Sequence, residues 1–84
     1  MRKALLGLVA SALLFAGQAF ALELFQAEDA ARQHCPKDTV VWLNTPTMIW
    51  HYEGQRWYAH TKHGSFACKL EAAAAGARGT KNGQ

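Results

Sequence analysis

Two cysteines, Cys35 and Cys68, bracket the part of this chain that is richest in strand-forming residues. The segment between them includes residues 40–58, VVWLNTPTMIWHYEGQRWY, which carries all three tryptophans and both tyrosines. A bridge between the cysteines would remove loop entropy from the unfolded chain and stabilise a fold by about 3–4 kcal/mol. Whether the cysteines pair depends on the compartment in which the protein folds, because disulfides persist mainly outside the cytosol.

The amino-terminal segment has the three parts of a secretory signal peptide. Positive charge at Arg2 and Lys3 precedes an apolar run over residues 4–15, and residues 19–21, AFA, match the small-x-small cleavage pattern. The apolar run is shorter than the roughly 20 residues that span a bilayer. We therefore expect a protein that is exported to the periplasm or the exterior and is not an integral membrane protein after cleavage. Cleavage is expected after Ala21, with Ala19 as the alternative.

Charge gives little support to a nucleic-acid partner once the leader is removed. Without its two basic residues, seven Lys and Arg face six Asp and Glu, a formal net charge of +1. Four histidines remain, so full protonation in mild acid would raise the charge to +5. The charge of the mature chain therefore depends on pH.

A disulfide between Cys35 and Cys68 is the favoured state of the cysteine pair in an exported chain of this size. A zinc site that adds His34, His60 or His63 to the two sulfurs is an alternative, and free thiols are another. Structural zinc sites usually take cysteines from short C-x-x-C knuckles, whereas these two lie 33 positions apart.

Hydrophobic periodicity and turn residues predict an α+β fold. Residues 24–34 have helical spacing of apolar positions and end before Pro36, and residues 69–75 are strong helix formers followed by Gly76. Strands are expected over residues 39–44, 48–52 and 65–68, while residues 56–59 could form a short strand or an irregular segment. We expect one domain over residues 22–78, a three-stranded antiparallel sheet flanked by an N-terminal and a C-terminal helix, and a flexible tail over residues 79–84.

His51 is the histidine of greatest chemical interest because it lies inside an apolar strand. Strand alternation places Ile49 and His51 on one face and Trp50 and Tyr52 on the other, so His51 points to solvent or a cleft if the tryptophan face is buried. Glu53 would share its side, and the pair could act as acid and base in a small hydrolase. No nucleophile can be assigned, so a structural or surface role is favoured.

Arg56, Trp57 and Tyr58 combine a cation with aromatic rings, a combination that can also bind single-stranded nucleic acid. With a charge near +1, we favour the alternative in which Trp42, Trp50 and Trp57 form the core and Arg56 covers an indole face.

The motifs VWLNT at residues 41–45, IWH at 49–51, GQRWY at 54–58, TKHG at 61–64 and EA at 71–72 occur at fixed spacing. Together they resemble a family of small exported bacterial proteins of unassigned function, whose motif reads approximately VWVNTxSGxYHxxGxRWYGxTKxGxY before an EA-containing helix. The resemblance covers residues 35–84 and implies a small sheet with a packed helix. This chain departs from the pattern at Met48 and Ala59, where glycine is usual, and at Trp50, where tyrosine is usual.

More distantly, the pattern is similar to the metal-binding domain of Ada-type DNA repair proteins, which hold zinc through four cysteines. The alignment places His51, Gln55, Thr80 and Gly83 at or near those ligand positions. Only His51 is a good zinc ligand, so the resemblance implies the fold without the metal site or its chemistry.

The polar members of the motif that local structure does not explain form the predicted ligand-binding surface: Asn44, His51, Arg56, Tyr58, Thr61 and Lys62. We expect a non-enzymatic domain without a cofactor, a metal or catalytic residues. Its expected partner is an anionic group, such as an envelope polysaccharide, a lipid head group or nucleic acid, that binds more tightly when the histidines are protonated.

Overall fold

The central strand of the sheet is β1 (Val40–Asn44), formed by the β-branched and aromatic run that follows the first cysteine. In the computed structural model, which describes residues 21–84, β1 pairs antiparallel with β2 (Ile49–His51) and with β3 (Ser65–Cys68). These three strands confirm the α+β class that the sequence predicts. The predicted signal peptide, apart from Ala21, lies outside the described residues.

A fourth strand makes the sheet mixed rather than purely antiparallel. β4 (Arg78–Gly79) runs parallel to β2, and the strand order is β3-β1-β2-β4. The Arg78 amide donates to the Met48 carbonyl, and the Thr80 amide donates to the Trp50 carbonyl. The prediction of three antiparallel strands was therefore incomplete, because two residues without strand propensity join the sheet through backbone bonds alone. Gly79 also lies where a flexible tail was expected.

The amino-terminal helix is shorter than its periodicity suggested. α2 (Glu28–His34) begins four residues after the predicted start, and Phe25 instead forms a bridge to Phe66 with backbone bonds of 2.9 and 2.8 Å. Periodicity alone cannot separate a helical residue from an extended one whose side chain packs on the same core. The segment before α2 therefore lies against β3 instead of extending the helix.

The second helix, α3 (Lys69–Ala74), starts directly at the end of β3 and ends one residue before the predicted Ala75, with Gly76 just beyond its C-cap residue. Gly76 has a φ of 101°, its amide donates to the Ala73 carbonyl, and the Ala77 amide donates to the Ala72 carbonyl. These two bonds satisfy carbonyls that the end of the helix would leave unpaired, and glycine adopts the left-handed conformation without steric cost.

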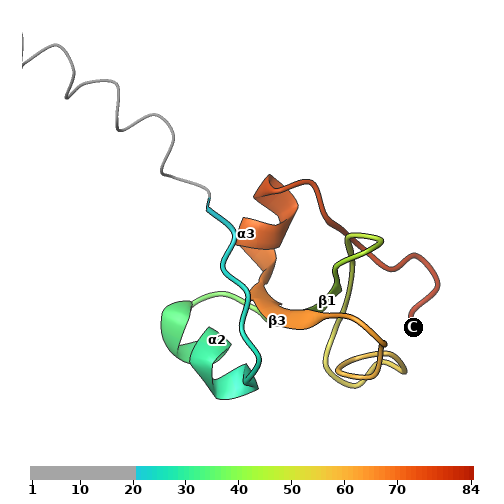
Figure 1. Ribbon diagram of the computed structural model, residues 1–84, viewed down its shortest axis with the longest axis horizontal. Coiled ribbons are helices and arrows are strands. Elements are labelled where there is room, and N and C mark those ends of the chain that lie inside the picture. The colour runs from blue at the N-terminus through green and yellow to red at the C-terminus, as the bar shows by residue number, and fades with distance from the viewer. Residues whose placement is uncertain (1–20) are drawn as a thin grey trace, which may run out of the picture.

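Alternation along the strands divides the buried side chains between the two faces of the sheet. One face packs on α3 and holds the main core, which consists of Val41, Leu43, Trp50, Ala67, Ala72 and Ala77. The other face carries Trp42 and Phe66, whose rings meet edge-on at 4.9 Å between centroids. Figure 1 shows α2 and α3 apart from each other, on different sides of the β1–β3 pair.

The three tryptophans do not form one core, which corrects the sequence prediction. Trp50 is buried and Trp42 is half-buried, but Trp57 is 38% exposed. Residues 56–59 form turns and no strand. Because this segment is not part of the sheet, strand alternation does not direct the Trp57 side chain toward the core.

The predicted disulfide between Cys35 and Cys68 is present, with 6.2 Å between the two Cα atoms. It joins the residue after α2 to the last residue of β3, and thereby ties α2 to the sheet edge. Within residues 21–84, no helix has the length and hydrophobicity needed to cross a membrane.

Candidate ligand-binding pocket

A surface pocket of about 430 Å³ opens beside the exposed end of β2, on the side of the sheet that carries His51. This volume falls within the range of small-molecule sites. Its walls come from the β1–β2 turn, the β2–β3 loop and the segment after β4. The lining residues are Asn44, Thr47, Ile49, His51, Trp57, His60, Thr61, Lys62, Thr80, Asn82 and Gln84.

His51 is the buried polar group of the pocket. It pairs in register with Trp42 of β1, on the strand face opposite Trp50, and lines the pocket, but it is only 7% exposed, so it does not point freely to solvent. Its Nδ1 is buried and has no hydrogen-bond partner in the described part of the chain. An unpaired buried nitrogen of this kind costs about 1–3 kcal/mol, a cost that a hydrogen bond to a bound ligand would reduce.

The β2–β3 loop forms its pocket wall because Trp42 anchors it to the sheet. The indole Nε1 of Trp42 donates to Thr61 Oγ1 at 2.7 Å, and the Thr61 hydroxyl donates to the His63 carbonyl at 2.8 Å. A side chain at Gly64 could not fit, since its Cβ would lie 2.6 Å from the Trp42 ring. The close approach of Gly64 and the bond to Thr61 hold Lys62 at the rim.

The opposite wall is the segment after β4, which the sequence predicted as a loosely draped tail. The Trp57 amide donates to the Gln84 carbonyl at 3.0 Å, and the Thr80 hydroxyl donates to Asn82 Oδ1 at 2.8 Å. Together with the bond from the Thr80 amide to the Trp50 carbonyl, they give residues 80–84 partners on β2, on the β2–β3 loop and within the segment itself. The sequence did not predict this contribution.

The pocket has a cationic and polar lining. His51, His60 and Lys62 are its basic side chains, and the described residues that line it include no aspartate or glutamate. Asn, Gln and Thr side chains supply most of the remaining polar atoms, and one wall is the indole of Trp57. Such a lining can neutralise an anion and hydrogen-bond to its oxygens, while the ring offers a flat apolar contact.

Four of the six residues predicted to bind a ligand lie together in this pocket: Asn44, His51, Thr61 and Lys62. The other two, Arg56 and Tyr58, lie outside it. The Arg56 guanidinium carbon sits 4.8 Å from the centre of the Trp57 ring, the predicted stacking of a cation over an indole face.

Tyr58 makes contacts that link the β2–β3 loop to α2 and β3. Its hydroxyl donates to Glu28 Oε2 at 2.7 Å, and its ring packs edge-on against Phe66 at 5.7 Å between centroids. Burial raises the pKa of the Tyr58 hydroxyl well above its ordinary value, and the bond to the Glu28 carboxylate raises it further. The same bond lowers the pKa of Glu28, with a further contribution from Arg32. Tyr58 is therefore a protonated donor that joins the loop to α2.

The acid–base pair considered from the sequence, His51 with Glu53, is not assembled in the described residues. Glu53 is highly exposed, and its carboxylate pairs with Arg32 at 3.2 Å. No hydrogen bond joins it to His51 among the residues that the structure places. β2 ends at His51, so strand alternation no longer sets the direction of Glu53.

Sequence reasoning did not assign seven of the lining residues to a binding surface: Thr47, Ile49, Trp57, His60, Thr80, Asn82 and Gln84. Trp57 was expected in the core, and the last three were expected in a tail.

A small disulfide-bridged α+β domain with a polar, cationic surface pocket is the class that fold and site define. Comparisons with known protein families, with curated proteins and with solved structures found no match for this chain.

Proposed function

We propose that this protein is an exported, non-enzymatic domain that binds a small anionic group in the pocket around His51. The observation that carries the proposal is the convergence of His51, His60 and Lys62 on a pocket whose described lining has no aspartate or glutamate side chain. An anion there gains charge-assisted hydrogen bonds that no acidic side chain of the lining opposes.

Protonation would strengthen this binding. Histidine is the side-chain type that gains positive charge in mild acid, and two of the three basic residues of the pocket, beside Lys62, are histidines. We expect an anionic ligand to bind more tightly at about pH 5.5 than at about pH 7.5.

The test is a titration of the mature chain with three anionic probes: an oligouronate, glycerol phosphate and a short single-stranded oligonucleotide. A neutral oligosaccharide of the same length is the uncharged reference. Trp57 fluorescence and the amide signals of Asn44, His51 and Thr61 report on the pocket. The probe that binds most tightly identifies the envelope polysaccharide, lipid head group or nucleic acid as the natural class.

Lys62→Gln is the informative variant, because Lys62 is exposed and its loss should not affect folding. Removal of one exposed charge should weaken anion binding about two- to fivefold. Lys37→Gln is the matched control, since Lys37 is also exposed but lies outside the pocket lining. Equal binding of anionic and neutral probes, or equal effects of the two variants, would refute the proposal.

A further inference from the structure

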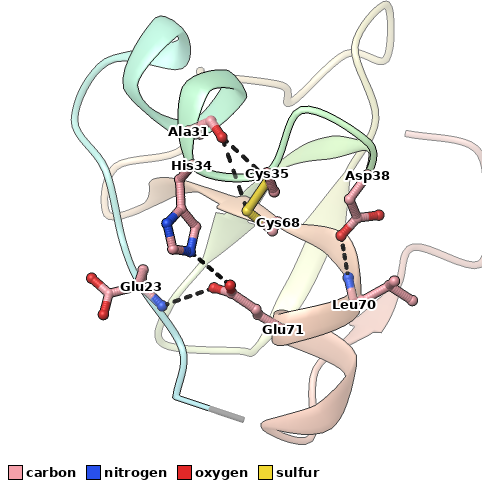
Figure 2. A network of polar contacts seen from close by, with 8 residues as sticks. All are labelled: Glu23, Ala31, His34, Cys35, Asp38, Cys68, Leu70 and Glu71. Carbon is pink, nitrogen blue, oxygen red and sulfur yellow. Dashed lines mark hydrogen bonds and ion pairs between the residues drawn. A yellow bond between two sulfur atoms is a disulfide. The ribbon is translucent and has the colours of Figure 1, made fainter. Parts of the chain in front are cut away.

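The disulfide lies within a cluster of metal-binding side chains on the α2–α3 side of the molecule (Figure 2). His34 is the last residue of α2, Cys35 follows it, Cys68 ends β3, and Glu71 belongs to the first turn of α3. The His34 Nε2 and Glu71 Oε2 atoms are 2.7 Å apart. None of these four residues lines the pocket around His51.

The donor atoms of this cluster are close enough to share one ion. A ring nitrogen of His34, the Cys68 sulfur and a carboxylate oxygen of Glu71 all lie within 4.8 Å of one another, and Cys35 Sγ is bonded to that sulfur. Two sulfurs, one imidazole and one carboxylate are a donor set suited to tetrahedral Zn²⁺. The sequence separation that argued against zinc is irrelevant here, since the sheet already brings the two cysteines together.

In the bridged state the sulfurs cannot act as thiolate ligands. We propose that the reduced chain binds one Zn²⁺ ion through Cys35, Cys68, His34 and Glu71, so that the disulfide and the metal are alternative closures of the same site. This inference is independent of the proposed function, because it uses a different surface and a different ligand.

A dithiol can serve as the reductant that converts the disulfide-bridged state into the zinc-binding state. The dithiol gives two electrons and two protons to the S–S bond and becomes a disulfide, while Cys35 and Cys68 become thiols. Zn²⁺ then displaces both thiol protons to solvent. Because the Glu71 carboxylate only accepts, His34 Nε2 carries a proton in the bridged state. That proton passes through solvent to Nδ1 when the metal binds, which frees the Nε2 lone pair, and the bond between His34 and Glu71 is replaced by two bonds to the ion.

Polar contacts around the cluster would hold the donors in place after the bridge opens. Asp38 accepts hydrogen bonds from the Thr39 amide at 2.7 Å and from the Leu70 amide at 2.9 Å, and thereby links the turn after Cys35 to the start of α3. The Glu23 amide donates to the second Glu71 oxygen at 3.2 Å. Figure 2 shows these bonds on both sides of the sulfur pair.

The donor cluster is accessible from solvent on the side of His34 and Glu71. The His34 side chain is 37% exposed and Glu71 is 26% exposed, whereas Cys68 is buried. An ion could therefore enter past His34 and Glu71 and bind the sulfurs behind them.

The test uses Co²⁺ as a spectroscopic substitute for Zn²⁺ on the mature chain, in its oxidised form and after reduction by a phosphine under anaerobic conditions. The reduced chain should bind one equivalent of Co²⁺, with thiolate charge-transfer bands and the intense visible bands of tetrahedral coordination. Zn²⁺ should displace it, and the oxidised chain should show no bands. Amide NMR dispersion in the Zn²⁺ complex reports whether the metal restores the fold if the reduced apo chain loses it.

His34→Ala and Glu71→Gln should each weaken Zn²⁺ binding by at least about tenfold, the lower end of the loss seen even for outer-shell partners. His63→Ala is the matched control, because His63 is an exposed histidine of the β2–β3 loop. Four results would overturn the site: equal Zn²⁺ affinity in His34→Ala or Glu71→Gln and the unmutated chain, loss of affinity in His63→Ala, Co²⁺ bands without tetrahedral character, or metal binding by the oxidised chain. Equal affinity would show that two unfolded thiols bind the ion by themselves.

Discussion

Two residues other than glycine adopt left-handed backbone conformations, Met48 with a φ of 58° and Ala59 with a φ of 61°. Each such residue costs about 1–2 kcal/mol, because its Cβ crowds the following carbonyl. These are the same two positions where the resembled family pattern has glycine. Met48 offsets its strain because its side chain packs against the main core, whereas exposed Ala59 has no such compensation.

Ala59→Gly should raise the free energy of unfolding by up to about 1 kcal/mol, the strain relieved less the extra entropy of glycine in the unfolded chain. Urea denaturation of the two proteins measures the change. Ala73→Gly is the control, since Ala73 is exposed inside α3 and should lose about 0.5–1 kcal/mol. A loss of stability in Ala59→Gly would contradict the strain assigned to this position.

At the scale of elements, α2 and the β2–β3 loop are joined by a small polar network. Glu28 accepts hydrogen bonds from Tyr58 at 2.7 Å and from Arg32 at 2.8 Å, and Arg32 also reaches Glu53 at 3.2 Å. The Tyr58 bond and the Arg32 bond both lower the pKa of Glu28 below its ordinary 4.5. The link therefore needs an ionised Glu28 and a protonated Tyr58.

Because the folded pKa of Glu28 is below its unfolded value, its contribution to stability is complete above pH 4.5 and is lost as pH falls through the folded value. Tyr58→Phe should cost about 1 kcal/mol at neutral pH and should reduce the loss of stability in acid. Thermal unfolding at a series of pH values from neutral to about 3 measures both effects.

Tyr52→Phe is the control for this link, because Tyr52 follows β2 and its ring lies against Trp50 on the other face. Removal of the Tyr52 hydroxyl should leave the loss of stability between neutral and acid pH unchanged. If both variants lost less stability in acid by the same amount, Glu28 would not be responsible for the acid sensitivity.

At the scale of the whole molecule, size limits what the core can contribute. A domain of about 60 residues buries only around 60% of the surface that its unfolded chain exposes. The buried set here is small and includes three alanines in the main cluster. The cross-link between Cys35 and Cys68 therefore supplies a large share of the stability.

Replacement of both cysteines by serine should lower the free energy of unfolding by about 3–4 kcal/mol, because the unfolded chain regains the entropy of the closed loop. Urea denaturation followed by tryptophan fluorescence measures the loss. The single variant Cys35→Ser should lose nearly as much, since either change removes the cross-link. Full stability in the double variant would show that packing alone holds the domain.

Much of this fold could be predicted from local sequence. The strands around Trp42, Trp50 and Phe66, the helix after Cys68 and the Gly76 cap follow from residue types and spacing. β4 could not be predicted in the same way, because Arg78 and Gly79 join the sheet through the backbone and carry no strand-forming side chains.

The pocket likewise contains residues that local sequence could predict and residues that it could not. Strand alternation predicted that His51 would face away from the Trp50 core, and the motif residues Asn44, Thr61 and Lys62 lie in the pocket with it. Local patterns could not place Trp57 or residues 80–84 there, because turns and loops have no fixed periodicity. The displacement of Arg56 and Tyr58 from the pocket likewise depends on partners distant in sequence, such as Glu28.

The sequence by itself determined three of the four strands, the approximate positions of both helices, the cysteine pair and the face on which His51 lies, because propensity, capping and alternation act between near neighbours. The tertiary structure alone decided that segments after β2 and β4 close a cationic pocket, and that His34 and Glu71 meet at the disulfide. Those juxtapositions arise from backbone pairing and packing between segments more than 20 residues apart, as for His34 and Glu71. No local pattern encodes such contacts.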